Sequence, residues 1–428
     1  MRVNIITMGC SKNLVDSESM MARFAAAGCE VYFDAAGAGF DVVIINTCGF
    51  IHDAKQESVD MILEYAEARK RGEMGKLCIT GCLSERYREE LIREIPEADI
   101  VLGCDAFEGL KRELSLTGAC CTPGERLLST PSHYAYLKIS EGCDRKCSFC
   151  IIPAIRGKHI SRPVESLVNE GSLLAQKGVK EIILVAQDLS SYGSDLYNRV
   201  ALDKLLMKLT EINGLEWIRL HYAYPAGFPD KVLEIMAGNK KICRYLDIPL
   251  QHISDNVLKK MRRGINKQKT LELIDRIRNK VPGIVLRTTL LTGHPGETVH
   301  DFEELKDFVR SARFERLGVF PYSHEEGTWA YDNLSDDVHD SEKERRVAEI
   351  MEIQKEVSAG FNNRLTGTEI KAIIDSEEDE FYNGRTEFDS PEVDNGVLIK
   401  KSKQLVIGSF VNLKITGSDD YDLYARPV

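Results

Sequence analysis

The sequence predicts an α/β protein in three parts: an N-terminal parallel-sheet α/β domain, a partial (β/α)6 TIM-like barrel, and a small C-terminal all-β barrel. Three observations predict this fold class. Apolar strand-like runs alternate with helical patterns over residues 1–120, the alternation continues through six further units, and the tail holds short strand-like runs between turn signals. Strand–helix alternation is typical of parallel sheets covered by helices. We place the domains at residues 1–120, 129–358 and 361–428.

In the N-terminal domain, three apolar strands are each followed by a turn of small residues and a helix. The strands are predicted at residues 3–7, 41–46 and 76–79. The first helix is expected to begin near Asp16 or Ser17, either of which can cap it, and to stop at Gly28. The next helices are expected at residues 52–70 and from Ser84 onward.

The middle of the chain predicts six βα units, which are too few for a complete eight-unit barrel and suit a partial one. Its strands are expected at residues 135–139, 182–186, 218–223, 245–249, 284–291 and 317–322, with helical patterns that include 202–212, 270–280 and 301–312. A charged helix at residues 340–360 then connects to the tail. There, strands at residues 369–374, 396–400 and 411–416 suggest a small β-barrel.

Composition and charge favour a globular protein of the cytoplasm. With 43% hydrophobic and 29% charged residues, wholesale disorder is excluded. No apolar run approaches the roughly 18–20 residues that span a bilayer, and the first residues are too polar for a secretion signal. We therefore expect no membrane contact. The formal net charge of -11 disfavours a broad nucleic-acid footprint and suits a basic partner.

Three of the twelve cysteines, Cys143, Cys147 and Cys150, form a C-x3-C-x2-C loop after the first strand of the middle region. Disulfides are rare in a reducing compartment, so clustered thiols there point to metal or redox chemistry. Three thiolates can hold a four-iron cluster and leave one iron open for a substrate or cofactor. The alternative is a zinc site, for which His159 could supply the fourth ligand.

A second set of cysteines, Cys10, Cys48 and Cys82, follows the first three strands. The carboxyl ends of parallel strands lie along one edge of a sheet, so these thiols are expected to converge there. The alternative is that they are buried, inert thiols. The remaining cysteines are interpreted as packing or surface thiols without convergent placement; they are Cys29, Cys78, Cys104, Cys120, Cys121 and Cys243.

The loop with Phe149 before its last cysteine resembles the radical S-adenosylmethionine (SAM) enzymes, and the earlier trio, with Cys10 in GCSKNLVDSE, resembles the methylthiotransferases among them. The resemblance covers nearly the whole chain and implies an N-terminal cluster domain, a radical SAM core and a C-terminal TRAM domain. It also implies two 4Fe-4S clusters, one on Cys143, Cys147 and Cys150 and one on Cys10, Cys48 and Cys82, with SAM as the further cofactor.

Two subgroups of methylthiotransferases compete. One modifies an adenosine of tRNA; the other, the RimO type, modifies the β-carbon of an aspartate in small-subunit ribosomal protein S-twelve. The GCSKN stretch at Cys10 is similar to the GCPKN pattern of the second subgroup, with Ser11 in place of proline. Residues 361–428 carry eight Lys and Arg against thirteen Asp and Glu. An acidic tail fits a basic ribosomal protein better than tRNA, although a merely solvated surface is the alternative.

The resemblance also implies how the cofactors work. One electron splits SAM into methionine and a 5′-deoxyadenosyl radical, which takes hydrogen from an unactivated carbon. The second cluster is implied to carry the sulfur that is attached, and both open irons would face one cavity. Expected SAM contacts are Phe149 near the adenine, Gln187 after the second core strand, and the turn with Gly293 and Gly296.

The partners follow from the same chemistry. We expect ribosomal protein S-twelve as substrate, an electron donor such as a flavodoxin or ferredoxin, and a separate sulfur donor. A third hypothesis, from a different class, is a non-catalytic iron–sulfur or zinc protein, which would not cleave SAM. The sequence leaves open the identity of both donors, the oligomeric state, and whether the substrate is the free protein or the assembled subunit.

Overall fold

The computed structural model describes residues 1–118, 121–401 and 404–428. The chain divides into two compact units. The first unit comprises Met1–Thr130, Tyr136–Arg145 and Cys150–Leu173, and the second comprises Pro131–Ala135, Lys146–Phe149 and Leu174–Val428. Cys120 lies outside the described residues. No helix within the described part of the chain combines the length and apolarity needed to cross a bilayer.

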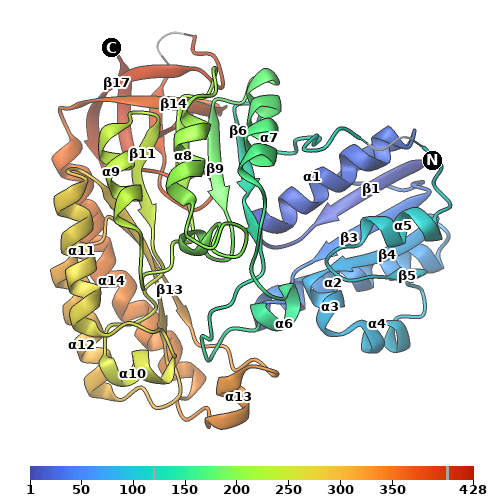
Figure 1. The fold of residues 1–428 in the computed structure, drawn as a ribbon, viewed down its shortest axis with the longest axis horizontal. Helices are drawn as coiled ribbons and strands as arrows, with labels where there is room; N and C mark the ends of the chain where they lie inside the picture. Colours follow the sequence, from blue (N-terminus) through green and yellow to red (C-terminus); the bar gives the residue numbers. More distant parts are fainter. Residues whose placement is uncertain (119–120, 402–403) are drawn as a thin grey trace. The chain divides into compact units, whose positions relative to one another are not determined.

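The first unit is built on a five-stranded sheet in the order β2-β1-β3-β4-β5, in which every neighbouring pair is parallel (Figure 1). Its strands are β1 (Arg2–Thr7), β2 (Glu30–Phe33), β3 (Val42–Thr47), β4 (Lys76–Gly81) and β5 (Ile100–Val101). This confirms the predicted parallel sheet. The short strands β2 and β5 were not predicted. Strand β2 has four residues, all at least partly exposed, and β5 has only two, so neither shows a clear alternation of apolar and polar side chains.

Helices cover both faces of this sheet, because successive strand residues point to opposite sides. On one face, α1 (Ser11–Ala26) and α5 (Phe107–Glu113) pack against Ile5 and Ile44. On the other, α2 (His52–Lys70), α3 (Cys82–Arg86) and α4 (Arg88–Glu94) pack against Ile6 and Ile45. A small antiparallel pair, β7 (Ser140–Glu141) and β8 (Ile160–Ser161), and helix α6 (Ile152–Arg156) complete the unit.

Helix α1 begins at Ser11, so the predicted start near Asp16 or Ser17 is wrong. The physical reason is the buried side chain of Asn13, whose Nδ2 donates hydrogen bonds to the carbonyl oxygens of Met8 and Thr47, both at 3.0 Å. These bonds hold the first turn against the ends of β1 and β3. Tertiary contacts of this kind override a capping signal read from the sequence alone.

The second unit contains a six-stranded sheet in the order β13-β12-β11-β10-β9-β6, which confirms the partial barrel. Four neighbouring pairs, from β9 to β13, are parallel. The strands are β6 (Tyr134–Lys138, which the division crosses), β9 (Glu181–Val185), β10 (Trp217–Leu220), β11 (Ile242–Asp247), β12 (Val285–Thr292) and β13 (Arg316–Pro321). The helical segments are α7 (Val164–Gln176, which the division also crosses), η1 (Leu189–Ser191), α8 (Leu202–Thr210), α9 (Asp230–Gly238), α10 (Asp255–Lys260), α11 (Lys267–Lys280), α12 (Val299–Ala312), α13 (Trp329–Asn333) and α14 (Asp340–Leu365).

The tail forms the predicted small β-barrel, which is closed and has its strands in the order β14-β15-β16-β18-β17 (Figure 1). Its strands are β14 (Glu369–Glu377), β15 (Phe381–Thr386), β16 (Val397–Lys400), β17 (Phe410–Ser418) and β18 (Leu423–Pro427). Alternate side chains such as Ala372, Ile374 and Leu413 fill its core. The barrel closes through the parallel pair of β16 and β18, a long-range contact that no local pattern predicts.

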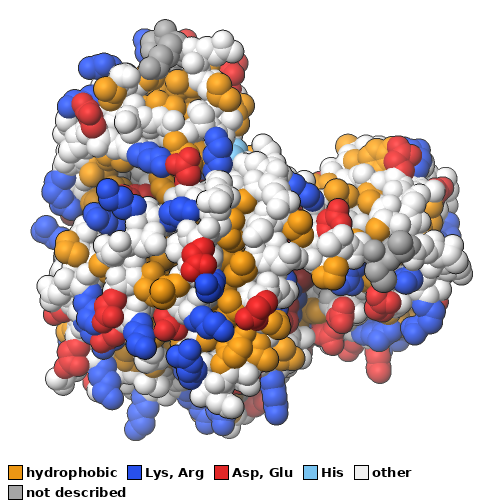
Figure 2. All heavy atoms as spheres, turned by 45° about the horizontal axis from the view of Figure 1, so that its top comes forward, with side chains coloured by type: hydrophobic (Ala, Val, Ile, Leu, Met, Phe, Trp, Pro, Cys, Tyr) orange, Lys and Arg blue, Asp and Glu red, His pale blue; other side chains and the backbone are white. Residues whose placement is uncertain are grey.

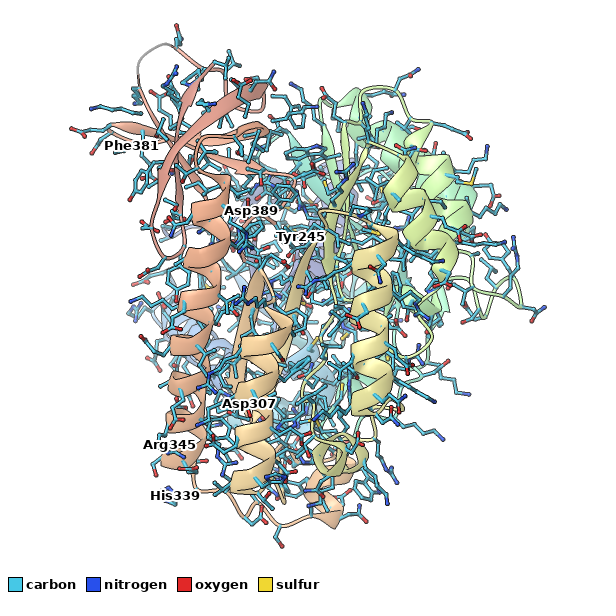
Figure 3. The ribbon with its side chains drawn as sticks, turned by 90° about the vertical axis from the view of Figure 1, so that its left-hand side faces the viewer. Tyr245, Asp307, His339, Arg345, Phe381 and Asp389 are labelled. Atoms are coloured by element: carbon cyan, nitrogen blue, oxygen red, sulfur yellow. The ribbon has the colours of Figure 1, made fainter. Side chains whose placement is uncertain are left out.

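Buried polar and charged side chains join the segment after β15 to the strands of the partial barrel, and Figure 3 labels two of them, Tyr245 and Asp389. Arg219 Nε lies 2.8 Å from Glu181 Oε1, and Arg219 Nη1 donates to the carbonyl oxygen of Glu387 at 2.8 Å. Arg316 Nη2 lies 2.6 Å from Asp389 Oδ1, and the Tyr245 hydroxyl donates to Asp394 at 2.6 Å. Burial penalises each unpaired charge, so these pairs fix the segment against the strands.

Replacing Glu181 by glutamine is expected to destabilise the protein by about 3–5 kcal/mol. The carboxylate of Glu181 is fully buried and pairs with both Arg219 and Arg385, each at 2.8 Å, so its loss leaves buried positive charge without its partner. Denaturant unfolding would measure the change. The matched control, Glu211→Gln in an exposed pair with Lys208, should cost less than about 1 kcal/mol. Equal effects of the two changes would contradict this account.

Candidate cluster sites

Cys10, Cys48 and Cys82 lie at the carboxyl ends of the adjacent parallel strands β1, β3 and β4. Cys10 occupies the N-cap of α1, Cys48 directly follows β3, and Cys82 is the first residue of α3. Because β3 pairs with both β1 and β4, these three strand ends meet at one edge of the sheet.

The three thiols influence one another. Burial, together with the neighbouring thiolates at Cys10 and Cys82, raises the pKa of Cys48 to about 11. A Cβ atom built on Gly9 would lie only 2.8 Å from Cys48 Sγ, so the chain before Cys10 passes directly against that sulfur. Buried thiolates that repel one another are stabilised when a cationic group binds among them, and iron is such a group.

Cys82 has a different environment from Cys48. A hydrogen bond with the Cys104 thiol and, to a smaller extent, the Arg156 guanidinium lower the pKa of Cys82 to about 6, although burial opposes the change. Cys104 therefore lies beside Cys82, and its interpretation as a thiol without convergent placement is wrong. The signal that could have placed it is its position shortly after β5, the next strand in the sheet.

Cys143, Cys147 and Cys150 lie on the loop between β7 and α6, and all three are half-buried. The division of the chain crosses this loop: Cys143 and Cys150 belong to the first unit and Cys147 to the second. The backbone N–H of Arg145 donates to Cys143 Sγ at 3.4 Å, and Arg263 Nη1 donates to Cys147 Sγ at 3.2 Å.

The chemistry of both trios fits iron–sulfur clusters. None of the described cysteines is in a disulfide, so the thiols are available as ligands. Among the described residues, no three His, Cys, Asp or Glu side chains gather closely enough for a single metal ion. A four-iron cluster accepts thiolates at separate irons, which lie further apart than ligands of one ion. His159, the predicted alternative zinc ligand, has its Nε2 atom 3.0 Å from Ser161 Oγ.

The predicted SAM contacts lie in the second unit and stay predictions. The Phe149 ring meets the His294 ring edge-to-face, with centroids 6.4 Å apart, and half-buried Gln187 follows β9. The N–H of Gly293 donates to Glu297 at 2.6 Å, and that of Gly296 donates to Asp337 at 2.8 Å. The two glycine amides are thus engaged by carboxylates of the chain itself.

Replacing Gly9 by alanine is expected to reduce the iron bound by the trio of Cys10, Cys48 and Cys82. The new methyl group would sit 2.7–2.8 Å from the Cys48 side chain, at a φ of 87° that L-residues rarely adopt. Iron analysis after anaerobic purification measures the effect. The control Gly28→Ala has a similar φ of 82° but nothing within 4 Å, so it should keep its iron. Full iron content in the Gly9 variant would contradict the prediction.

Comparison with known proteins agrees with this architecture. The chain matches the radical SAM superfamily over residues 137–309, the uncharacterized protein family UPF0004 over 2–103 and the TRAM domain over 366–428. Among solved structures, the radical S-adenosylmethionine methyltransferase TsrM from Kitasatospora setae has a TM-score of 0.53 at 15% identity, covering 75% of this chain and 74% of TsrM. OxsB, a cobalamin-dependent S-adenosylmethionine radical enzyme, has a TM-score of 0.53 at 12% identity, covering 82% of this chain and 56% of OxsB. Both similarities concern the fold.

The fold and the cysteine loop define a radical SAM enzyme, the class for which one 4Fe-4S cluster and SAM are the cofactors. Two relatives narrow this class. Both are ribosomal protein uS12 methylthiotransferases RimO. The one from Porphyromonas gingivalis is 52% identical over 100% of this chain and 99% of its own length, and the one from Flavobacterium johnsoniae is 53% identical over 100% of this chain and 98% of its own length. The chain belongs to the RimO family of methylthiotransferases. This confirms the predicted resemblance, including the choice between the two subgroups.

Proposed function

We propose that this protein attaches a methylthio group to the β-carbon of an aspartate in ribosomal protein uS12, the S-twelve protein of the small subunit. The observation that carries the proposal is its identity of more than 50%, over the whole length, to methylthiotransferases named for uS12. These relatives match the chain along all three of its parts, which supports a shared chemistry and a shared substrate. The cysteine trios supply the ligands that this chemistry needs.

Each trio has a separate task in this proposal. Cys143, Cys147 and Cys150 would hold the cluster that binds SAM, and Cys10, Cys48 and Cys82 would hold a second cluster at the edge of the N-terminal sheet. When bound, the first cluster and SAM supply a radical that removes hydrogen from an unactivated carbon. Phe149 and Gln187 would orient SAM.

The partners follow from charge and chemistry. Residues 361–428 carry an excess of acidic side chains, which suits a basic substrate protein. On the face seen in Figure 2, basic and acidic side chains are interspersed. We further propose a flavodoxin or ferredoxin as electron donor, a separate sulfur donor, a cytoplasmic location, and domains at residues 1–120, 129–358 and 361–428.

Mass spectrometry of uS12 from cells that lack this gene tests the proposed substrate. The protein should lose its methylthio modification in the deletion strain and regain it when the gene is supplied in trans. Modified tRNA adenosines from the same cells serve as the control and should be unchanged. Retention of the methylthio group on uS12, together with loss of the tRNA modification, would overturn the proposal in favour of the tRNA subgroup.

A further inference from the structure

We propose that Arg156 and Arg263 are positioning residues, each of which holds a guanidinium group against one thiol sulfur of one cysteine trio and thereby raises the reduction potential of the cluster on that trio. The inference rests on the proposed assignment of clusters to the two trios. It assigns a role to two arginines that are far apart in the sequence and that belong to different units of the fold.

Arg156 ends helix α6, and its side chain is only 4% exposed. Its Nε and Nη2 atoms both lie 3.3 Å from Cys82 Sγ. The rest of the guanidinium is fixed by Asn13 Oδ1 at 2.5 Å and by the carboxylates of Asp16 and Glu141, at 2.8 and 3.2 Å. The three contacts with Asn13, Asp16 and Glu141 leave the guanidinium little freedom, so it presents two N–H donors to one sulfur.

The charge around Arg156 is balanced. Lys138 pairs with the same two carboxylates, Asp16 and Glu141. These four side chains carry two positive and two negative charges, not counting the Cys82 thiol. Loss of the Arg156 charge would leave a net negative group beside Cys82. The hydrogen bonds that Arg156 donates and its positive charge therefore both stabilise negative charge on the Cys82 sulfur.

Arg263 has the corresponding position at the other trio. Its side chain is buried, its Nη1 atom donates to Cys147 Sγ at 3.2 Å, and its Nη2 atom donates to the carbonyl oxygen of Pro249. The guanidinium carbon lies 4.4 Å from the centre of the Tyr224 ring, and the Tyr224 hydroxyl donates to the carbonyl oxygen of Arg263. The segments after β10 and β11 thus hold this donor on the cysteine loop.

Hydrogen bonds to cluster sulfurs and nearby positive charge favour the reduced cluster, which has gained one electron and is more negative. Both arginines supply a donor and a full charge at a buried site, where electrostatic interactions are stronger than in water. Each would make reduction of its own cluster easier. Because the donor meets one thiol of each trio, the effect is specific to that trio.

A reductive titration followed by electron paramagnetic resonance tests Arg263. The full chain is used with Cys10, Cys48 and Cys82 replaced by alanine, so that one cluster signal remains. Arg263→Gln should shift the potential to a more negative value, and Arg263→Lys should shift it less. The control Arg262→Gln removes the same charge one residue away, where the guanidinium lies 3.9 Å from the Trp329 ring, and should leave the potential unchanged.

The matching experiment for Arg156 replaces Cys143, Cys147 and Cys150 by alanine. Arg156→Gln should lower the reduction potential of the remaining cluster. The potential of the Arg156→Lys variant should lie between that of the glutamine variant and that of the parent. Arg86 donates to the carbonyl oxygen of Gly49, beside the same trio but not to a sulfur, so Arg86→Gln should have no effect. Iron lost from the glutamine variant but kept by the lysine variant, at an unchanged unfolding temperature, would also support the role.

The outcomes separate this inference from the proposed function. If the parent chain binds no iron on a trio, the proposed function fails. If iron is bound and the glutamine variants have the parent potential, or shift it no more than their controls, only the role of the arginines is overturned. Loss of iron in both the glutamine and lysine variants with a lowered unfolding temperature would equally overturn it, since the residue would then act on folding.

Discussion

Replacing Cys143, Cys147 and Cys150 together by alanine is expected to abolish both the reductive cleavage of SAM and methylthio transfer. No other described group offers three thiols on one short loop, and without thiolates the cluster that delivers an electron to SAM has no ligands. Acid–base side chains cannot replace the radical that SAM cleavage provides, because the hydrogen on the target carbon is not acidic enough to be removed as a proton at neutral pH. Chromatographic detection of 5′-deoxyadenosine after anaerobic incubation with dithionite measures the cleavage.

The matched control for this loss is Cys243→Ala. Cys243 is a fully buried thiol on β11 that packs against Trp217 and Tyr245, and burial raises its pKa to about 12, as expected for an inert core thiol. Its replacement should leave SAM cleavage intact, apart from a modest loss of stability. Continued SAM cleavage by the triple variant would contradict the assignment of the radical cluster to this loop.

Replacing Cys10, Cys48 and Cys82 by alanine is expected to have a divided effect: SAM cleavage persists, whereas methylthio transfer to uS12 falls to background. The two trios are held by different sequence segments, so removal of the edge thiols leaves the cysteine loop unchanged. The sulfur to be attached would then have no carrier. Cleavage is followed through 5′-deoxyadenosine, and transfer through the mass of uS12 in the same reaction.

Cys78→Ala is the control for this second variant. Cys78 lies on β4, four residues before Cys82, but its side chain is buried in the core between the sheet and α1. Its replacement removes a thiol from the same strand without touching the edge, so both activities should remain. Loss of SAM cleavage in the Cys10, Cys48 and Cys82 variant, with iron still present on the loop, would contradict separate tasks for the trios.

Patterns that are local in the sequence predicted most of the fold and the cysteine groups. The apolar strands of both sheets and the position of Cys10, Cys48 and Cys82 after their strands follow from period-two and strand–helix patterns. Features that depend on contacts distant in sequence did not follow. The start of α1 depends on Asn13 reaching Thr47, and the closure of the tail barrel depends on β16 meeting β18.

The residues around the thiols were the hardest to predict. Arg156 and Arg263 stand in the sequence as ordinary basic residues, and Arg263 is the last residue of the basic run at residues 259–263. The structure buries both against a cysteine sulfur. Cys104 was missed because β5 is only two residues long, too short to mark a strand end. Side chains that support a site from another segment leave no periodic signal.

Iron and acid-labile sulfide, counted per chain in anaerobically purified protein, test most directly the claim that six thiolates hold two clusters. Two clusters require about eight irons in the parent and about four in each of the two triple-alanine variants, since each four-iron cluster depends on its own trio. About four irons in the parent, unchanged when Cys10, Cys48 and Cys82 are replaced, or zinc in place of iron, would contradict it.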